Sequence, residues 1–263
     1  MLLTNKNAVI YGAGGAIGGA MARAFAREGA KVFLTGRTLA SVDAVARDIF
    51  AAGGVAEAAQ VDALDEQAVE KHLSAVAEKA GGIDISINAI SIPQRGVQGI
   101  PLVELSPESF TLPIATYTKT HFLTTRAAAR HMAEKGSGVI LTLTATPARI
   151  AAPLVGGMAP AWAAIEALSR SLAAELGRQG IRVICLRSDA IPETATIGEV
   201  YRLHADALGM TREQFQALSE GMNLLKRLPT LAEVANVAAF MASDQASAMT
   251  ATVANLSCGL IAD

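Results

Sequence analysis

Short runs of β-branched and aliphatic residues alternate along the chain with longer segments of helical periodicity. This rhythm predicts parallel strands joined by crossover helices, which form an α/β, doubly wound parallel sheet of about seven strands with helices on both faces. No internal repeat, low-complexity tract or linker interrupts the pattern, so we expect residues 1–263 to fold as a single domain. The expected strands are 7–11, 31–35, 55–61, 83–88, 138–144, 181–186 and 251–256, and the expected helices are 17–28, 39–52, 65–80, 106–134 and 160–178.

The composition argues against several classes of protein. Its 22 basic and 24 acidic residues leave a net charge of −2, and no basic run is longer than Lys226-Arg227, so nucleic acid is not an expected partner. The uncharged stretch 150–165 contains prolines and glycines and is shorter than the roughly 20 apolar residues of a membrane span. The two cysteines and four histidines show no metal-ligand spacing, so no metal is expected. Because Met1 leads straight toward a strand, without room for a signal peptide, we expect a cytoplasmic protein.

A glycine-rich turn follows the first expected strand and leads into the first helical segment. Glycines in such a turn let backbone N–H groups approach a phosphate, and the helix N-terminus adds partial positive charge. A turn of this kind, placed between a first strand and a first helix within about 30 residues, is typical of dinucleotide-binding proteins. The residues expected to surround the pyrophosphate are Gly12, Gly14, Gly15, Ala16, Ile17 and Gly18.

The ends of the next strands favour a particular dinucleotide. The second strand is followed by Arg37-Thr38, where an NAD-selective protein usually places an acidic residue that holds the ribose hydroxyls. An arginine suits a ribose 2′-phosphate instead, so we expect NADP(H) rather than NAD(H). Asp62 follows the third strand and can accept from the adenine amino group, although its position equally suits a helix N-cap. The expected contacts after the second to fourth strands are Arg37, Thr38, Asp62, Ala63, Asn88, Ala89 and Ile90.

These landmarks, in this order, resemble the short-chain dehydrogenase/reductase family, whose members have a Rossmann fold. The resemblance covers nearly the whole chain, because 165–176, 180–183 and 231–244 are similar to the family's fifth helix, sixth strand and final helix. The resemblance implies a small-molecule substrate and a homo-oligomer, a dimer or tetramer formed through the fourth and fifth helices. The chain departs from the family pattern at two positions. Ala16 stands where a glycine is usual in the glycine-rich turn. Ile90 stands where the family's Asn-Asn-Ala-Gly motif, which follows the fourth strand, has its glycine.

The largest departure concerns catalysis. Members of the family use a Tyr-x-x-x-Lys pair on the fifth helix, a serine after the fifth strand and an asparagine on the fourth helix. The aligned residues here are Met158, Trp162, Ala145 and Tyr117, and none of the three tyrosines is followed by lysine four positions later. Methionine, tryptophan and alanine cannot give a proton to a carbonyl oxygen as the tyrosine does.

Three residues are candidates for a substitute catalytic group. Tyr117 and His121 are four apart on an expected helix, share one face and are predicted to form a proton relay. The alternative is that Tyr117 fills the volume of the missing catalytic side chains while His121 packs beside it. Thr144 lies next to the lost serine and can donate to a substrate oxygen, although a strand threonine is commonly a β-propensity choice.

Segment 192–228 breaks the strand–helix rhythm and is expected to form two short helices that cover a substrate pocket. Within it, Tyr201, His204 and Asp206 are candidate substrate contacts, and Met210, Phe215, Met222 and Leu224 are candidates for an apolar lid.

Three functions are compatible with the sequence. One is an NADP(H)-dependent oxidoreductase that acts on a small carbonyl, alcohol or enone through a non-standard active site. Another is a nucleotide-binding protein without dehydrogenase activity, serving as a sensor or assembly subunit. A third is a non-redox isomerase, cyclase or dehydratase that uses the same pocket.

Overall fold

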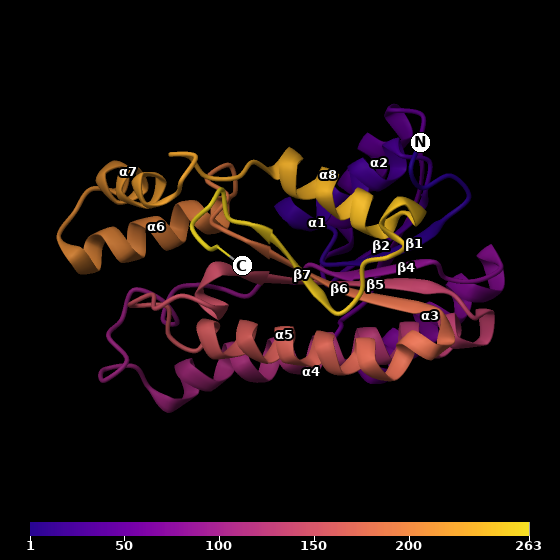
Figure 1. The fold of residues 1–263 in the computed structure, drawn as a ribbon, viewed down its shortest axis with the longest axis horizontal. Helices are drawn as coiled ribbons and strands as arrows, with labels where there is room; N and C mark the ends of the chain where they lie inside the picture. Colours follow the sequence, from indigo (N-terminus) through magenta and orange to yellow (C-terminus); the bar gives the residue numbers. More distant parts are fainter. Residues whose placement is uncertain (263) are drawn as a thin grey trace.

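A single seven-stranded sheet organises the computed structural model, which describes residues 1–262. All its strands run parallel, in the order β3-β2-β1-β4-β5-β6-β7 (Figure 1). This arrangement confirms the predicted doubly wound class. The strands are β1 (Asn7–Tyr11), β2 (Lys31–Gly36), β3 (Val55–Gln60), β4 (Ile85–Asn88), β5 (Gly138–Ala145), β6 (Ile181–Ser188) and β7 (Thr252–Leu256).

Helices cover both faces of the sheet. In Figure 1, α1, α2 and α8 lie above the strands, and α3, α4 and α5 lie below them. Each layer buries its own apolar cluster against the sheet, so the strands are covered on both sides. None of the helices within residues 1–262 is long and apolar enough to cross a membrane. The helices of the two layers are α1 (Ala16–Arg27), α2 (Leu39–Ala51), α3 (Glu66–Ala80), α4 (Pro107–Lys135), α5 (Met158–Leu176) and α8 (Leu231–Ala242).

The start of α5 differs from the prediction. We expected the helix to begin at Pro160, but it begins two residues earlier, at Met158. A proline is tolerated in a first helical turn because the N–H groups there have no intrahelical acceptor. The helix that carries the residues aligned with the family's catalytic pair therefore starts at the first of them.

A close contact between backbones fixes this end of α5 against α4. A Cβ atom at Gly157 would overlap the carbonyl oxygen of Phe110, so only glycine allows the two helices to approach this closely. The contact places the first turn of α5 beside the first half of α4. Tyr117 and Met158 consequently belong to the same buried apolar cluster.

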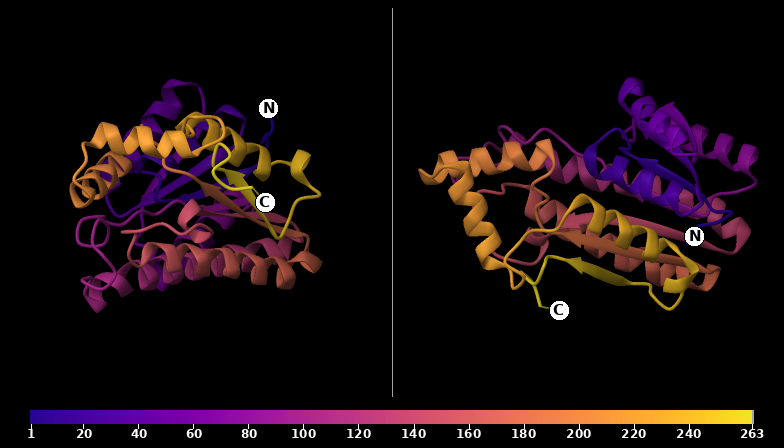
Figure 2. Two further views of the ribbon diagram at one scale, coloured as in Figure 1. Left: turned by 60° about the vertical axis from the view of Figure 1, so that its left-hand side comes forward. Right: turned by 90° about the horizontal axis from the view of Figure 1, so that it is seen from above.

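Segment 192–228 forms two short helices, as predicted: α6 (Ala195–Leu208) and α7 (Arg212–Met222). They project beyond the carboxyl ends of the central strands, at the left of Figure 1, and Figure 2 shows them extending from the sheet in both further views. The inner side of α6 is buried, with Val200 and Tyr201 packed against Leu228. No residue of α7 is buried.

A buried ion pair joins β6 to α5. The Arg187 side chain donates from Nε to Oε1 of Glu166 at 2.7 Å and from Nη2 to Oε2 at 2.8 Å. Both side chains are almost fully buried, at 2% and 5% exposure. Thr144 on β5 also donates to Glu166, at 3.2 Å, so the carboxylate is bonded from two neighbouring strands.

Removal of one partner of this pair should be costly. We expect Glu166→Ala to lower the free energy of unfolding by about 1.5–3 kcal/mol, because the buried Arg187 guanidinium loses both of its hydrogen bonds to the carboxylate. Urea denaturation measures the loss. Glu175→Ala, an exposed position on the same helix, should change the value by less than about 0.5 kcal/mol. The double replacement Glu166→Leu with Arg187→Met should recover most of the stability. A Glu166→Ala variant as stable as the parent protein would contradict the expectation.

Candidate functional site

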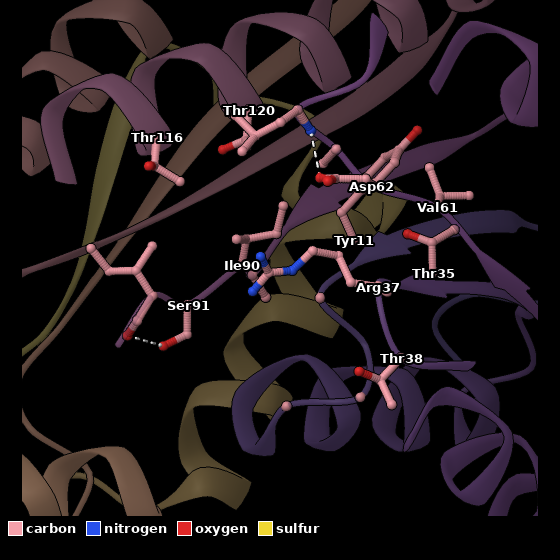
Figure 3. Close-up of a pocket in the computed structure, with 18 of the residues that line it drawn as sticks. Tyr11, Thr35, Arg37, Thr38, Val61, Asp62, Ile90, Ser91, Thr116 and Thr120 are labelled. Carbon is pink, nitrogen blue, oxygen red and sulfur yellow. Dashed lines mark hydrogen bonds between the residues drawn. The ribbon is translucent and has the colours of Figure 1, made fainter. Parts of the chain in front are cut away.

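A pocket of about 380 Å³ opens at the carboxyl edge of the sheet. Its walls come from the turns that follow β1, β2, β3 and β4, and from α4 (Figure 3). In open parallel sheets ligands bind at this edge, where neighbouring strands have crossover connections to opposite faces. Nine of the predicted nucleotide-site residues line the pocket: Gly12, Gly14, Gly15, Arg37, Thr38, Asp62, Ala63, Ala89 and Ile90.

The glycine turn is shaped by close contacts between backbones. Gly12 has a φ of +77°, and a Cβ atom there would lie 2.7 Å from the carbonyl oxygen of Ala89. Gly18 faces the carbonyl of Gly12, where a Cβ atom would also overlap. The glycines therefore let the first helical turn fold tightly over the end of β1.

The beginning of α1 leaves its N–H groups available to a ligand. The helix starts at Ala16, and its N-cap residue, Gly15, provides no side-chain hydrogen bond. An uncapped helix N-terminus beside a pocket combines free donors with the positive end of the helix dipole. Ala16, Ile17 and Gly18 belong to this first turn but do not line the pocket themselves.

Arg37 is the main cationic side chain of the pocket wall. Its guanidinium reaches across the pocket toward Ile90, and Thr38 lies below it (Figure 3). The backbone carbonyl of Arg37 accepts from Gln60 at 2.9 Å, which fixes the turn after β2. A guanidinium in this position can form paired hydrogen bonds with a phosphate.

Asp62 lines the pocket, whereas Asn88 forms hydrogen bonds behind the pocket wall. Asp62 lines the pocket, and its Oδ1 accepts from the backbone N–H of Leu64 at 3.0 Å. The N-cap of α3 is Asp65, so the alternative role for Asp62 as a helix cap does not apply. Asn88 lies behind the pocket wall, where its Oδ1 accepts from Ile90 at 3.1 Å and its Nδ2 donates to Thr124 at 3.2 Å. It fixes the turn after β4 to α4.

Several pocket residues were not predicted from the sequence. Tyr11, the last residue of β1, lines the pocket although its hydroxyl is buried without a partner among the described residues. Ser41 at the start of α2, and Thr116 and Thr120 on α4, complete the wall. The helical period of Thr116 and Thr120 is a signal for a shared face, but nothing in sequence alone points that face toward the glycine turn.

The positions aligned with the family's catalytic residues are mainly apolar and packed together. Met158 and Tyr117 are buried in one cluster with Ile92 and Ile165, and Trp162 packs against it. Ala145 ends β5. Of the four aligned residues, Tyr117 alone carries a hydroxyl group that could serve as a proton donor.

Tyr117 and His121 lie near each other but do not share a hydrogen bond between side chains. Their ring centroids are 6.3 Å apart, and Nδ1 of His121 pairs with the backbone carbonyl of Tyr117 at 2.9 Å. Burial lowers the pKa of His121 to about 4, which keeps the ring neutral near pH 7. Burial also raises the pKa of Tyr117 to about 12, a shift opposed by contacts with Ile92 and Ser91. The relay between the two side chains stays a prediction.

Thr144 is directed away from the pocket. Its hydroxyl bonds Glu166 at 3.2 Å and lies 3.3 Å from the Cys185 thiol, both between β5, β6 and α5. It is 3% exposed and does not line the pocket. These contacts favour a structural task for Thr144 over donation to a substrate.

The proposed cover segment does not line the pocket. Nε2 of His204 pairs with Oε1 of Gln98 at 3.1 Å, while Tyr201 is buried against Phe215. The other candidates, Asp206, Met210, Met222 and Leu224, are exposed to solvent.

The fold and the strand-end pocket define a dinucleotide-type Rossmann protein. Residues 12–260 match the family model described as "Enoyl-(Acyl carrier protein) reductase". Gluconate 5-dehydrogenase of Gluconobacter oxydans is 31% identical over 181 residues, 69% of each chain. A probable 2,4-dienoyl-CoA reductase of Bacillus subtilis is 30% identical, over 93% of this chain and 92% of its own. The crystal structure of a gluconate 5-dehydrogenase from Burkholderia cenocepacia J2315, in complex with NADP and tartrate, superposes with a TM-score of 0.86 at 25% identity, covering 98% of this chain and 96% of that chain.

The chain therefore belongs to the short-chain dehydrogenase/reductase family of oxidoreductases.

The contact between Gly12 and Ala89 can be tested by substitution. We expect Gly12→Ala to lower stability and to abolish nucleotide binding, because the added methyl group meets both an unfavourable φ and the Ala89 carbonyl. Gly53→Ala is the matched control, since Gly53 has a similar φ of +81° but open space around it. The control should lose about 1–2 kcal/mol of unfolding free energy for its backbone alone. Thermal unfolding measures the stability of the two variants, and nucleotide titration measures their binding. Equal losses of stability and of nucleotide affinity in the two variants would mean that the contact between Gly12 and Ala89 contributes to neither.

Proposed function

We propose that the protein is an NADP(H)-dependent oxidoreductase that acts on a small carbonyl, alcohol or enone substrate through a non-standard active site. The observation that carries the proposal is Arg37, exposed in a pocket that the glycine turn also lines. A 2′-phosphate on the adenosine ribose would bind the guanidinium, and the pyrophosphate would bind the uncapped end of α1.

The residues present fit the dinucleotide at several points. Gly14 and Gly15 line the pocket beside the start of α1, where no side chain caps the helix N–H groups that a pyrophosphate would use. In this proposal the Asp62 carboxylate, which lines the pocket, accepts from the adenine amino group. When bound, NADPH supplies the hydride, and the protein orients its ring and excludes water.

The relatives support a redox function of this kind. One solved structure is a gluconate 5-dehydrogenase with NADP, and other relatives include a probable dienoyl-CoA reductase. Substrates of the two kinds differ, since one enzyme is named for a hydroxy acid and the other for an unsaturated thioester. We infer only a small molecule with an alcohol, carbonyl or enone group.

A second candidate function is nucleotide binding without redox turnover. It is favoured by the apolar cluster of Met158, Tyr117 and Trp162, which occupies the positions of the family's polar catalytic groups. In this case the pocket binds NADP(H) as a sensor or assembly subunit would, and no substrate is reduced.

Calorimetric titration tests the nucleotide part of the proposal. We expect NADPH to bind at least about tenfold more tightly than NADH, and Arg37→Ala to abolish most of that difference by removing a charge-assisted pair worth about 1.5–3 kcal/mol. Arg47→Ala, an exposed arginine on α2 outside the pocket wall, should leave both affinities unchanged. Equal affinity of the parent protein for the two nucleotides would overturn the NADP(H) assignment.

Turnover assays decide between the two candidate functions. Aldehydes, ketones, enones and alcohols should be screened by the change in absorbance of the nicotinamide. With an identified substrate, Tyr117→Phe should lower kcat by about 100-fold or more if the Tyr117 hydroxyl is the proton donor. His131→Ala serves as the control for His121→Ala, because His131 lies on the same helix but is ten residues away from His121 and only half-buried; neither histidine lines the pocket wall. Full turnover in both Tyr117→Phe and His121→Ala would remove the relay, and no turnover with any substrate would favour the second candidate.

A further inference from the structure

The strand-end pocket occupies only part of the crevice at the carboxyl edge of the sheet. A doubly wound sheet is built from two nucleotide-binding halves, and a dinucleotide lies across the crevice between them. Within residues 1–262, the pocket lining comes from the ends of β1, β2, β3 and β4 and from α2 and α4. It includes no residue of β5, β6, α5 or segment 192–228. The pocket therefore covers the first half of the crevice, the half formed by β1–β3, and the turn after β4 that borders it.

The groups that suit phosphates gather in this first half. Arg37, Thr38 and Ser41 line the pocket around the start of α2. Thr38 is the N-cap residue of α2, but its side chain forms no capping hydrogen bond. The start of α1 is likewise uncapped at Gly15. Two helix N-termini with uncapped N–H groups and one guanidinium thus lie at the same cavity, which suits a ligand with more than one phosphate.

Hydrogen bonds within the protein occupy the polar side chains of the second half, at the ends of β5 and β6. Thr146, which follows β5, is buried and donates to Oδ1 of Asp189 at 3.3 Å. Oδ2 of the same carboxylate accepts from the buried Asn223 at 3.0 Å. Ser188, the last residue of β6, donates to the Asp189 carbonyl at 2.8 Å, and Thr194 caps α6. These side chains are bonded to the protein itself and leave few partners for a ligand.

Apolar side chains close the second half from the side of α5. Met158 and Ile165 are buried in one cluster with Tyr117, and Trp162 packs against it. The nicotinamide carries an amide group, which donates and accepts hydrogen bonds. Burial of such a group without partners is unfavourable. The ring would have to displace these side chains in order to enter.

We propose that the protein binds NADP(H) through the 2′-phosphoadenosine diphosphate half alone, and that the nicotinamide ring stays outside the closed second half. This inference rests on the NADP(H) part of the proposed function, which the two candidate functions share. Redox turnover then requires a second step, in which the side chains of the second half make room for the ring.

The consequence is a site that does not sense the redox state of its nucleotide. NADPH and NADP⁺ differ only in the nicotinamide ring, and 2′-phospho-ADP-ribose is NADP⁺ without that ring. All three carry the same adenine and the same phosphates. Selectivity is a difference between affinities, so contacts confined to the shared half cannot separate the three ligands.

Calorimetric titration of the full chain with NADPH, NADP⁺ and 2′-phospho-ADP-ribose tests the proposal. We expect the three dissociation constants to agree within about threefold. Arg37→Ala should weaken all three by the same factor, about tenfold or more, because the ligands share the 2′-phosphate. Arg47→Ala, an exposed arginine outside the pocket wall, is the matched control and should change none of them. A larger advantage of NADPH or NADP⁺ over 2′-phospho-ADP-ribose overturns the proposal.

The fluorescence of NADPH reports on the ring directly. A ring that remains in water keeps the emission maximum of free NADPH, whereas a ring that enters the apolar cluster around Trp162 emits at shorter wavelength. We expect the emission maximum to stay unchanged when the protein is saturated with NADPH. A shift to shorter wavelength would show that the second half accepts the ring and would overturn the proposal.

These measurements distinguish failure of the inference from failure of the proposed function. If NADP⁺ or NADPH binds with the larger advantage, the ring is held by the protein, and the oxidoreductase function stands without the inference. Equal binding of the three ligands, with no turnover of any substrate, supports the inference and overturns the oxidoreductase function. No binding of any of the three overturns the NADP(H) assignment on which both rest.

Discussion

The contact between the turns that follow β1 and β4 is the constraint on which the rest of the site depends. Gly12 lies so close to the Ala89 carbonyl that no side chain fits between them. β1 pairs with β2 on one side and with β4 on the other, so the chain reverses its direction of winding at this point. Both turns, together with those after β2 and β3, line the strand-end pocket. Gly15 at the uncapped start of α1 and the Arg37 side chain lie in the same pocket wall.

The sequence predicted the fold and most of the turns that line the strand-end pocket, because both depend on local signals. Each of these signals acts within a few residues of the chain. A run of apolar residues predicts a strand, a glycine-rich segment predicts the turn after it, and the residue that directly follows a strand is predicted to lie at the edge of the sheet. The predictions for Thr144 and Asn88 show where this reasoning ends. Each was placed correctly on its strand, but the strand alone does not reveal whether the side chain faces the ligand or a packed helix, and both proved to be bonded inside the protein.

The residues that were missed are those assembled from distant parts of the chain. Thr146, Asp189 and Asn223 come from the ends of two strands and from the segment after α7, and no periodicity relates them. The structure also separates the polar groups from the place where the family normally has them. The aligned positions on α5 are apolar or aromatic, as Met158 illustrates, while the half-buried Asp189 carboxylate accepts from the buried Asn223 amide at the end of α7.

The buried pair of Arg187 and Glu166 couples substitutions at separate positions. Trp162 stands four residues before Glu166 on α5, which is the spacing at which a lysine and a glutamate on a helix attract each other. A lysine at position 162 would compete with Arg187 for Glu166 and so weaken the link between helix and sheet. The effects of substitutions at positions 162, 166 and 187 on stability should therefore not be additive.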